Sequence, residues 1–218
     1  YGYQLWPKGI LKLLNVKYII LPGALINHTL FEDLGIKKMY YFGNNNNYNG
    51  NLVDINIYKF NDFSDRLFFT NNIQYGNKED IYRNILLDNY DPTEIIYIND
   101  AIIKNQFFDN SDRYVEITKW EADRIEFKIN TKSDQFLVIS EIFYPDGWTV
   151  TSNNKNHNIY EVNNLVRGVF VPSGKNEFIM SFKPYDLRLG RFISFIGYVL
   201  ILSLIFLYYW KERSNEKI

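Results

Sequence analysis

The stretch QFLVISEIFYPDGWTVTS, residues 135–152, is the part of the sequence that decides the fold. Its apolar and aromatic run is interrupted by PDG at 145–147 and resumes at Trp148. Proline, aspartate and glycine suit positions i+1, i+2 and i+3 of a type I turn. The stretch therefore predicts two β-strands, 135–144 and 147–152, joined by a tight corner.

The sequence on either side of this corner predicts a region made almost entirely of β-strands, from 113 to 186. Two alternating runs flank the EAD sequence at 121–123 and predict a hairpin. Further short runs, separated by turn-rich pieces, predict strands at 158–162, 165–171 and 176–184. Short strands at intervals of about 8–12 residues are typical of an antiparallel β-sandwich or jelly roll.

Residues 1–107 predict a smaller mixed α/β part, so the fold class expected for the whole chain is α+β. Apolar periodicity predicts helices at 8–14, 28–36 and 77–90, and strands at 16–22, 37–42, 52–60, 66–75 and 94–99. In the second of these helices, Thr29 and Glu32 have the spacing of a capping box. FDNSD at 108–112 is the expected joint to the β-region.

A transmembrane helix is predicted near the end of the chain. Residues 192–210, FISFIGYVLILSLIFLYYW, contain no charged side chain. Such a helix extends about 28 Å, close to the hydrocarbon thickness of about 30 Å. A buried core helix is the alternative, but the segment is apolar on every side. We therefore predict a transmembrane segment at 190–211, in contact with the lipid bilayer, and a short charged tail at 212–218.

The charges that flank this segment do not fix its orientation. Arg188 and Arg191 precede it, and Lys211, Arg213 and Lys217 follow it. Two cations against three is too small a difference for the positive-inside rule. On charge alone, the chain is either tail-anchored with its bulk in the cytoplasm or the last part of a multi-pass protein with its bulk outside.

The composition excludes some classes of function. A formal net charge of −1 gives no general attraction to nucleic acid, so no nucleic-acid partner is expected. The chain contains no cysteine, which excludes disulfides and thiol chemistry and fits an extracytoplasmic bacterial domain as well as a cytosolic one. The chain begins at Tyr1 with no signal-peptide pattern, so we expect it to be a piece of a longer protein.

The residues predict no catalytic site, no metal site and no cofactor. His28 and His157 lie far apart in loop-like contexts, without a carboxylate or cysteine at ligand spacing. No glycine-rich phosphate loop or nucleophile elbow is present, and PSGK at 172–175 is a turn between strands. LRLGR at 187–191 could contact lipid phosphates, but cations commonly flank a membrane span.

Weak candidates for ligand binding lie around the opening stretch: Glu141, Tyr144, Trp148 and Arg167. Trp148 could stack on a sugar ring, although a tryptophan at the start of a strand more often fills the core. Glu141 could act as a general acid with Asp146 or Glu161 as its partner. The simpler interpretation, which we favour, is a strand carboxylate paired with a cation such as Arg167.

Three stretches are the most distinctive of the chain: LLNVKY at 13–18, SEIFYPDGW at 140–148 and RGVFVPSGK at 167–175. In this order, and ahead of one terminal membrane helix, they resemble the C-terminal part of the YfhO-like bacterial membrane proteins. The resemblance covers nearly the whole chain. One small departure is Asp146, because the family often has Pro-Gly-Trp without a residue in between.

The resemblance implies a large multi-pass protein, similar to the C-type glycosyltransferases that use polyprenyl-phosphate sugars. Some family members are linked to glycosylation of cell-envelope glycans and polymers such as lipoteichoic acid. Residues 1–186 would then be extracytoplasmic, with the tail cytoplasmic, at the bacterial cell membrane. The partners would include the N-terminal transmembrane helices of the same protein. The family's catalytic carboxylates lie in early loops outside this chain, so no catalytic residue is carried over.

Three functions are compatible with these observations. The chain could be the non-catalytic C-terminal region of a glycosyltransferase-like membrane protein, where it positions the acceptor or covers the active site. It could instead be a membrane-anchored carbohydrate-binding module, with Trp120, Tyr144 and Trp148 holding a sugar. It could also be a purely structural domain. We expect the first, and we expect the chain alone to transfer no sugar.

Overall fold

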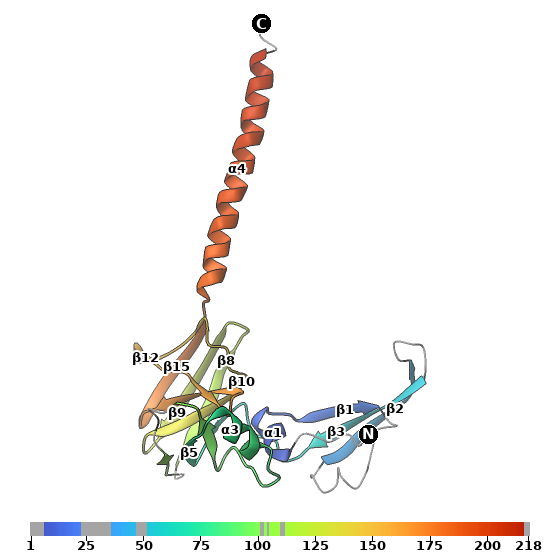
Figure 1. The fold of residues 1–218 in the computed structure, drawn as a ribbon, viewed down its shortest axis with the longest axis vertical. Helices are drawn as coiled ribbons and strands as arrows, with labels where there is room; N and C mark the ends of the chain where they lie inside the picture. Colours follow the sequence, from blue (N-terminus) through green and yellow to red (C-terminus); the bar gives the residue numbers. More distant parts are fainter. Residues whose placement is uncertain are drawn as a thin grey trace.

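The computed structural model of the chain describes residues 7–22, 36–46, 52–100, 103, 105–109 and 112–215. This part is mostly β-sheet, with short helices and one long C-terminal helix, which confirms the α+β class with a β-sandwich (Figure 1). The helices are α1 (Lys8–Leu13), α3 (Lys78–Ile85) and α4 (Tyr185–Asn215). The helix predicted at 28–36 lies outside the described residues, except for its last residue, which begins a strand.

A three-stranded sheet, the arm sheet, extends to one side of the molecule (Figure 1). Its strand order is β1-β3-β2, all antiparallel, with bounds Tyr18–Pro22, Leu52–Phe60 and Ile36–Asn46. The alternating sequence at 52–60 forms the middle strand, β3, which pairs with β1 on one side and with β2 on the other. Leu11 of α1 packs with Ile36, Tyr58 and Phe60 at the base of this sheet and connects it to the rest of the fold.

A seven-stranded sheet, the central sheet, has the order β4-β10-β14-β13-β6-β5-β7. In that order the strands are Leu67–Phe69, Gln135–Ile142, Val166–Val171, Tyr160–Val162, Ile96–Ile98, Asn72–Tyr75 and Gln106–Phe107. β5 and β6 are parallel, and the other pairs are antiparallel. The sheet thus combines strands from both sides of the joint predicted at 108–112.

A five-stranded antiparallel sheet, the outer sheet, has the order β12-β11-β15-β9-β8. In that order the strands are Lys155–His157, Trp148–Ser152, Gly174–Phe182, Arg124–Thr131 and Tyr114–Trp120. β8 and β9 form the hairpin that was predicted around 121–123. β12 lies inside a stretch that the sequence predicts as a turn, between β11 and β13.

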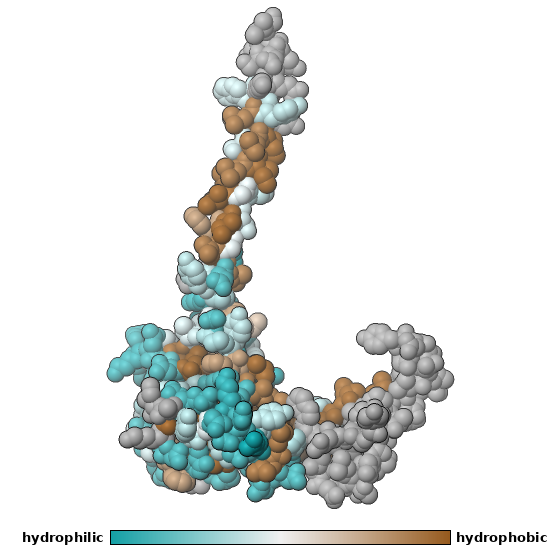
Figure 2. Space-filling view, viewed as in Figure 1, coloured by the Kyte–Doolittle hydropathy of each residue, from teal (hydrophilic) through white to brown (hydrophobic). Residues whose placement is uncertain are grey.

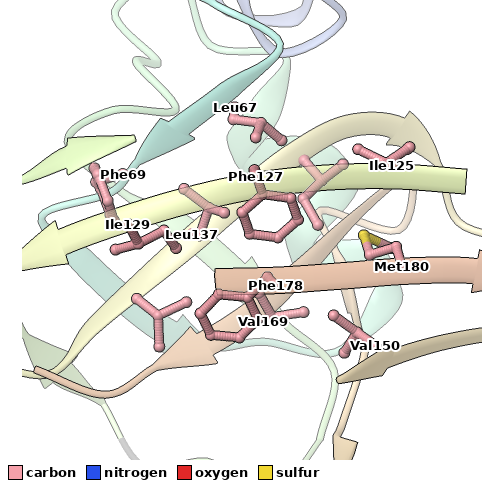
Figure 3. Packing of buried hydrophobic residues seen from close by; sticks show 12 residues of the cluster. Leu67, Phe69, Ile125, Phe127, Ile129, Leu137, Val150, Val169, Phe178 and Met180 are labelled. Carbon is pink, nitrogen blue, oxygen red and sulfur yellow. The ribbon is translucent and has the colours of Figure 1, made fainter. Parts of the chain in front are cut away.

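The central and outer sheets face each other and form the β-sandwich. Leu137, Ile139 and Val169 of the central sheet pack against Phe127 and Phe178 of the outer sheet. Figure 3 shows Leu137, Val169, Phe127 and Phe178 converging between the strands. The two phenylalanine rings stack with their centroids 5.3 Å apart. Side chains alternate between the two faces of a strand, so the residues between these core positions lie on the sheet faces that point away from the sandwich interior.

The opposite face of the central sheet is also buried. Phe136 and Val138 of β10 pack there with Leu13, Ile73 and Val162. β10 is therefore buried on both faces, which explains why its sequence is a continuous apolar run rather than an alternating one. Helix α3 lies beyond this layer and contributes Ile81 and Ile85 to a smaller cluster with Tyr90.

The LLNVKY stretch joins α1 to the central sheet. The Ser140 hydroxyl donates to the Leu13 carbonyl at 2.6 Å. Asn15 has φ +54° and its side-chain amide donates to the Ser64 carbonyl. Lys12 forms an ion pair of 2.7 Å with Asp91. The hydrogen bond between Ser140 and Leu13 shows that two of the three distinctive stretches meet in the fold.

Helix α4 leaves the sandwich and projects away from it (Figure 1). Its segment Tyr185–Tyr208, 24 residues long, is apolar enough to cross a membrane, and no part of it is buried inside the molecule. Figure 2 shows the apolar surface along this helix. At about 1.5 Å per residue the segment extends about 36 Å, enough for a hydrocarbon core of about 30 Å. The predicted transmembrane segment at 190–211 lies within α4.

Candidate site at the membrane end of the β-sandwich

The end of the sandwich next to α4, here called the membrane end, is held together by the last residues before the helix. Only Lys183 and Pro184 separate β15 from α4. The Phe182 amide donates to the Asp123 carbonyl at 2.8 Å, and the Lys183 amide donates to the Gly147 carbonyl at 2.7 Å. The β8–β9 turn and the PDG corner therefore both lie beside the start of the helix.

The PDG corner needs its glycine. Gly147 has φ +93°, a conformation that side chains rarely adopt. A Cβ at this position would lie 2.9 Å from the Phe182 ring and 2.9 Å from Pro184 Cβ. Asp146 and Gly147 form a bend between β10 and β11, so the predicted corner is present and packs tightly against the residues that lead into α4.

Arg167 of β14 lies between the two sheets at this end. It precedes Val169 and Val171 on the strand face that contributes to the sandwich core, and only 5% of its surface is exposed. Its Nε donates to the Ile142 carbonyl at 3.0 Å. Its guanidinium lies 4.3 Å from the centre of the Trp148 ring, across the sandwich on β11. This stacking holds a buried cation against an aromatic face.

The charge of Arg167 is incompletely compensated. Burial lowers the pKa of its guanidinium, and the nearby Glu141 carboxylate opposes that effect. Arg167 Nη1 is buried and has no hydrogen-bond partner among the residues that the structure describes. A buried donor without a partner costs free energy, which makes this position unusual for a purely structural residue.

A second arginine–tryptophan pair lies at the same end. The Arg66 guanidinium, just before β4, is 4.7 Å from the centre of the Trp120 ring at the end of β8. Arg66 Nη1 is also 3.6 Å from Glu141 Oε1. The Glu141 carboxylate therefore pairs directly with Arg66. The sequence favours Arg167 as its partner. The negative charge of Glu141 affects Arg167 as well, because it opposes the lowering of the guanidinium pKa by burial.

These residues form one group, here called the Arg–Trp cluster: Arg66, Trp120, Glu141, Trp148 and Arg167. Arg66 and Glu141 are partly exposed, whereas Arg167 is buried. Sequence reasoning missed Arg66, because it lies 75 positions from Glu141 in the chain (141 minus 66) and no spacing relates the two. Its position directly before an apolar strand was the only signal present.

Aromatic side chains extend the cluster toward the start of α4. The Trp148 and Phe182 rings lie 5.2 Å apart, and Tyr144 contacts Phe182 edge-on at 6.1 Å. Tyr144 is 55% exposed, whereas Trp148 is only partly accessible and has Arg167 against its ring. All four candidates from the sequence, Glu141, Tyr144, Trp148 and Arg167, therefore meet at the membrane end.

The other residues considered from the sequence lie elsewhere or make different contacts. Glu161 of β13 lies opposite Arg167 in the strand register. His157 Nε2 is 2.8 Å from Ser152 Oγ, and burial, followed by the charge of Lys155, lowers the pKa of its imidazole. His28 is outside the described residues. Within the described part of the chain, no group of three or more His, Asp or Glu side chains could hold a metal ion.

The chemistry of the cluster is that of recognition. The exposed Arg66 guanidinium can complement phosphate or carboxylate oxygens, and the exposed Tyr144 ring can contact the apolar face of a sugar or a lipid. The Glu141 carboxylate, 3.6 Å from Arg66 Nη1, can accept hydrogen bonds. Such a set can bind and orient a ligand beside the start of α4.

Comparison with protein families gives one match. The family model for the bacterial membrane protein YfhO matches residues 89–194. This range begins between α3 and β6, includes Glu141, Trp148 and Arg167, and ends in the first turns of α4. Searches of curated proteins and of solved structures found no match. This match confirms the resemblance to the YfhO-like bacterial membrane proteins over residues 89–194, just under half of the chain.

Proposed function

We propose that the chain is the non-catalytic C-terminal region of a multi-pass, glycosyltransferase-like membrane protein. The full protein would transfer sugars from polyprenyl-phosphate carriers to polymers of the bacterial cell envelope. In this arrangement the β-sheets are extracytoplasmic and the tail after α4 is cytoplasmic. The β-sandwich would position the acceptor or cover the active site, beside the N-terminal transmembrane helices of the same protein.

The observation that carries this proposal is the place of the Arg–Trp cluster beside the start of α4. The phosphate and sugar of a lipid-linked donor lie at the level of the lipid headgroups, while the polyprenyl chain lies in the hydrocarbon. A protein surface that meets such a donor there needs cations for the phosphate and aromatic rings for the sugar. Arg66 is half-exposed and Tyr144 is 55% exposed at the membrane end of the sandwich.

Each residue of the cluster has a distinct part in the proposal. Arg66 would contact the phosphate or an anionic acceptor, and Glu141 would keep Arg66 in place. Arg167 would hold Trp148 in its orientation, because its guanidinium lies against the ring. Tyr144 would offer the exposed aromatic surface. All of these are positioning or binding roles, and bond making would occur on residues outside this chain.

A carbohydrate-binding module without transferase activity is the second candidate. The exposed Tyr144 ring, next to Phe182 and Trp148, favours it, since aromatic platforms of this kind bind sugars. The two candidates differ in what the complete protein does. The first requires sugar transfer that depends on a polyprenyl-phosphate donor, and the second requires sugar binding alone.

Transfer assays on membranes test the proposal. Membranes with the full-length protein should transfer sugar from a polyprenyl-phosphate donor, and membranes with residues 1–218 alone should not. In the full-length protein, Glu141→Gln should raise KM by about 5–10-fold and change kcat by less than about twofold, because a positioning group acts on binding. Radiolabelled-donor kinetics measures both parameters.

Glu177→Gln is the matched control, because Glu177 is a strand carboxylate of the same sandwich that pairs with Lys128 on the surface. It should leave both parameters unchanged. A loss of kcat by more than about a hundredfold in the Glu141 variant would identify a catalytic group and contradict the proposal. Transfer by residues 1–218 alone would contradict it as well.

A further inference from the structure

We infer that the membrane end of the β-sandwich is seated in the lipid headgroup layer, with the PDG corner and the β8–β9 turn in contact with lipid. The sandwich then rests on the bilayer that α4 crosses and is not carried above it on a loose connection. This inference concerns the chain and its own bilayer, so it does not depend on whether the full-length protein transfers sugar.

The first step is the short and well-packed junction. β15 reaches α4 through Lys183 and Pro184 alone. The amides of Phe182 and Lys183 are bonded to the β8–β9 turn and to the PDG corner. Gly147 packs so closely on Pro184 that a Cβ would have no room. A proline and two hydrogen bonds at the junction restrict how far the helix can swing relative to the sandwich.

The second step is the distance along the helix. The uncharged segment begins at Phe192, and the helix begins at Tyr185. Seven residues of helix extend about 10 Å. The headgroup layer on each side of the hydrocarbon is about 5–8 Å thick. The junction therefore lies at the outer edge of the headgroups, and any tilt of the helix brings it closer to the hydrocarbon.

The third step is the chemistry of the exposed side chains at this end. Ile142, Tyr144 and Tyr185 are 56%, 55% and 67% exposed. Tyrosines concentrate where a protein meets the interface of a membrane, because the ring is apolar and its hydroxyl is polar. The exposed cation Arg66 and the exposed Lys183 are suited to lipid phosphates. Aromatic rings and cations together match a headgroup layer better than bulk water.

Site-directed spin labelling tests the inference directly, because the chain has no cysteine of its own. Ala122→Cys places a label on the β8–β9 turn, and Asp146→Cys places one on the PDG corner; both residues are exposed. Lys175→Cys is the matched control. Lys175 is exposed near the opposite end of β15, seven residues from Phe182, which corresponds to about 24 Å of strand.

The labelled chains are reconstituted in phosphatidylcholine–phosphatidylglycerol vesicles, and collision rates with oxygen and with a water-soluble nickel complex are measured. The labels at 122 and 146 should collide with the nickel complex at least about threefold less often than the label at 175, and more often with oxygen, as at a membrane interface. Adding Tyr144→Ser and Tyr185→Ser should raise the nickel collision rate at 146.

Two results would overturn the inference. The first is a set of equal nickel collision rates at 122, 146 and 175 in vesicles, which would place the sandwich in water above the bilayer. The second is protection of 122 and 146 that occurs in the full-length protein but not in the chain alone. That result would assign the membrane end to a protein partner instead of lipid.

Discussion

Replacement of Gly168 by valine is expected to abolish folding of the β-sandwich. A Cβ at this position would lie 2.3 Å from Phe136 Cε1 and 2.7 Å from Val162 Cγ2. Gly168 pairs with Val138 on one side and with Tyr160 on the other, in the middle of the central sheet. The backbone therefore cannot move away from the clash without separating three strands.

The size of the effect follows from the surroundings of Phe136. Its ring is fully buried and contacts Phe170 edge-on at 4.8 Å, so it cannot rotate out of the way. Overpacking of a core typically costs about 1–3 kcal/mol, and a valine at a site with no room for one carbon should exceed that range. Domain stabilities are about 5–15 kcal/mol, so most of the folded population would be lost.

Urea unfolding of the purified chain, followed by circular dichroism, measures this prediction. Gly168→Ala should lower the midpoint clearly, and Gly168→Val should leave no cooperative transition. Gly190→Ala is the control, because a Cβ there meets no atom within 4 Å, and it should leave the midpoint unchanged. Phe136→Leu should restore part of the loss in Gly168→Ala. An unchanged midpoint in Gly168→Ala would contradict the packing described for β10 and β14.

The double substitution Leu200→Arg and Leu204→Arg is expected to release the chain from the membrane. The two leucines lie one helical turn apart near the middle of the apolar segment, and both are exposed in the isolated chain. Each arginine at the centre of a transmembrane helix costs about 2.5–3.5 kcal/mol, and each lost leucine removes about 0.5 kcal/mol, which together gives about 6–8 kcal/mol.

Carbonate extraction of membranes measures this effect. The unchanged chain should stay in the pellet, and the double variant should appear in the supernatant. The control places the same two arginines on exposed positions of the sandwich, Asn156→Arg and Ser173→Arg, and should stay in the pellet. Retention of the Leu200 and Leu204 variant in the pellet would show that α4 is not what holds the chain in the membrane.

Local signals in the sequence predicted the β-region and the membrane helix well. The hairpin of β8 and β9 follows from two alternating runs around a polar turn, and both of those strands formed. Helix α4 follows from an uncharged apolar segment long enough to cross a bilayer. In both cases the information lies in neighbouring residues, so no knowledge of the tertiary fold is needed.

The arrangement of the strands could not be predicted in the same way. The strand expected at 66–75 is split, because β4 pairs with β10 while β5 pairs with β6 and β7 elsewhere in the sheet. Likewise, the continuous apolar run of β10 indicates a buried strand, but it does not show which residues cover its two faces. These features depend on partners that lie far away in the chain, and one sequence holds no signal for them.

The candidate site shows the same limit. Glu141, Tyr144 and Trp148 are close in sequence, and their proximity was predictable from the corner that joins β10 and β11. Arg66 was not predictable, because its contacts with Glu141 and Trp120 bridge segments that are distant in the chain. Only the tertiary fold shows that Arg66 is the cation that pairs directly with Glu141.

The proposed role depends on the β-sandwich lying outside the cytoplasm, and side-specific labelling measures this directly. In intact cells, Asp146→Cys should react with a membrane-impermeant maleimide, and Ser214→Cys, in the last turn of α4, should react only after the cells are permeabilised. The native chain adds no background, since it has no cysteine. Reaction of Ser214→Cys in intact cells, with Asp146→Cys protected until permeabilisation, would place the sandwich in the cytoplasm and contradict the proposed function.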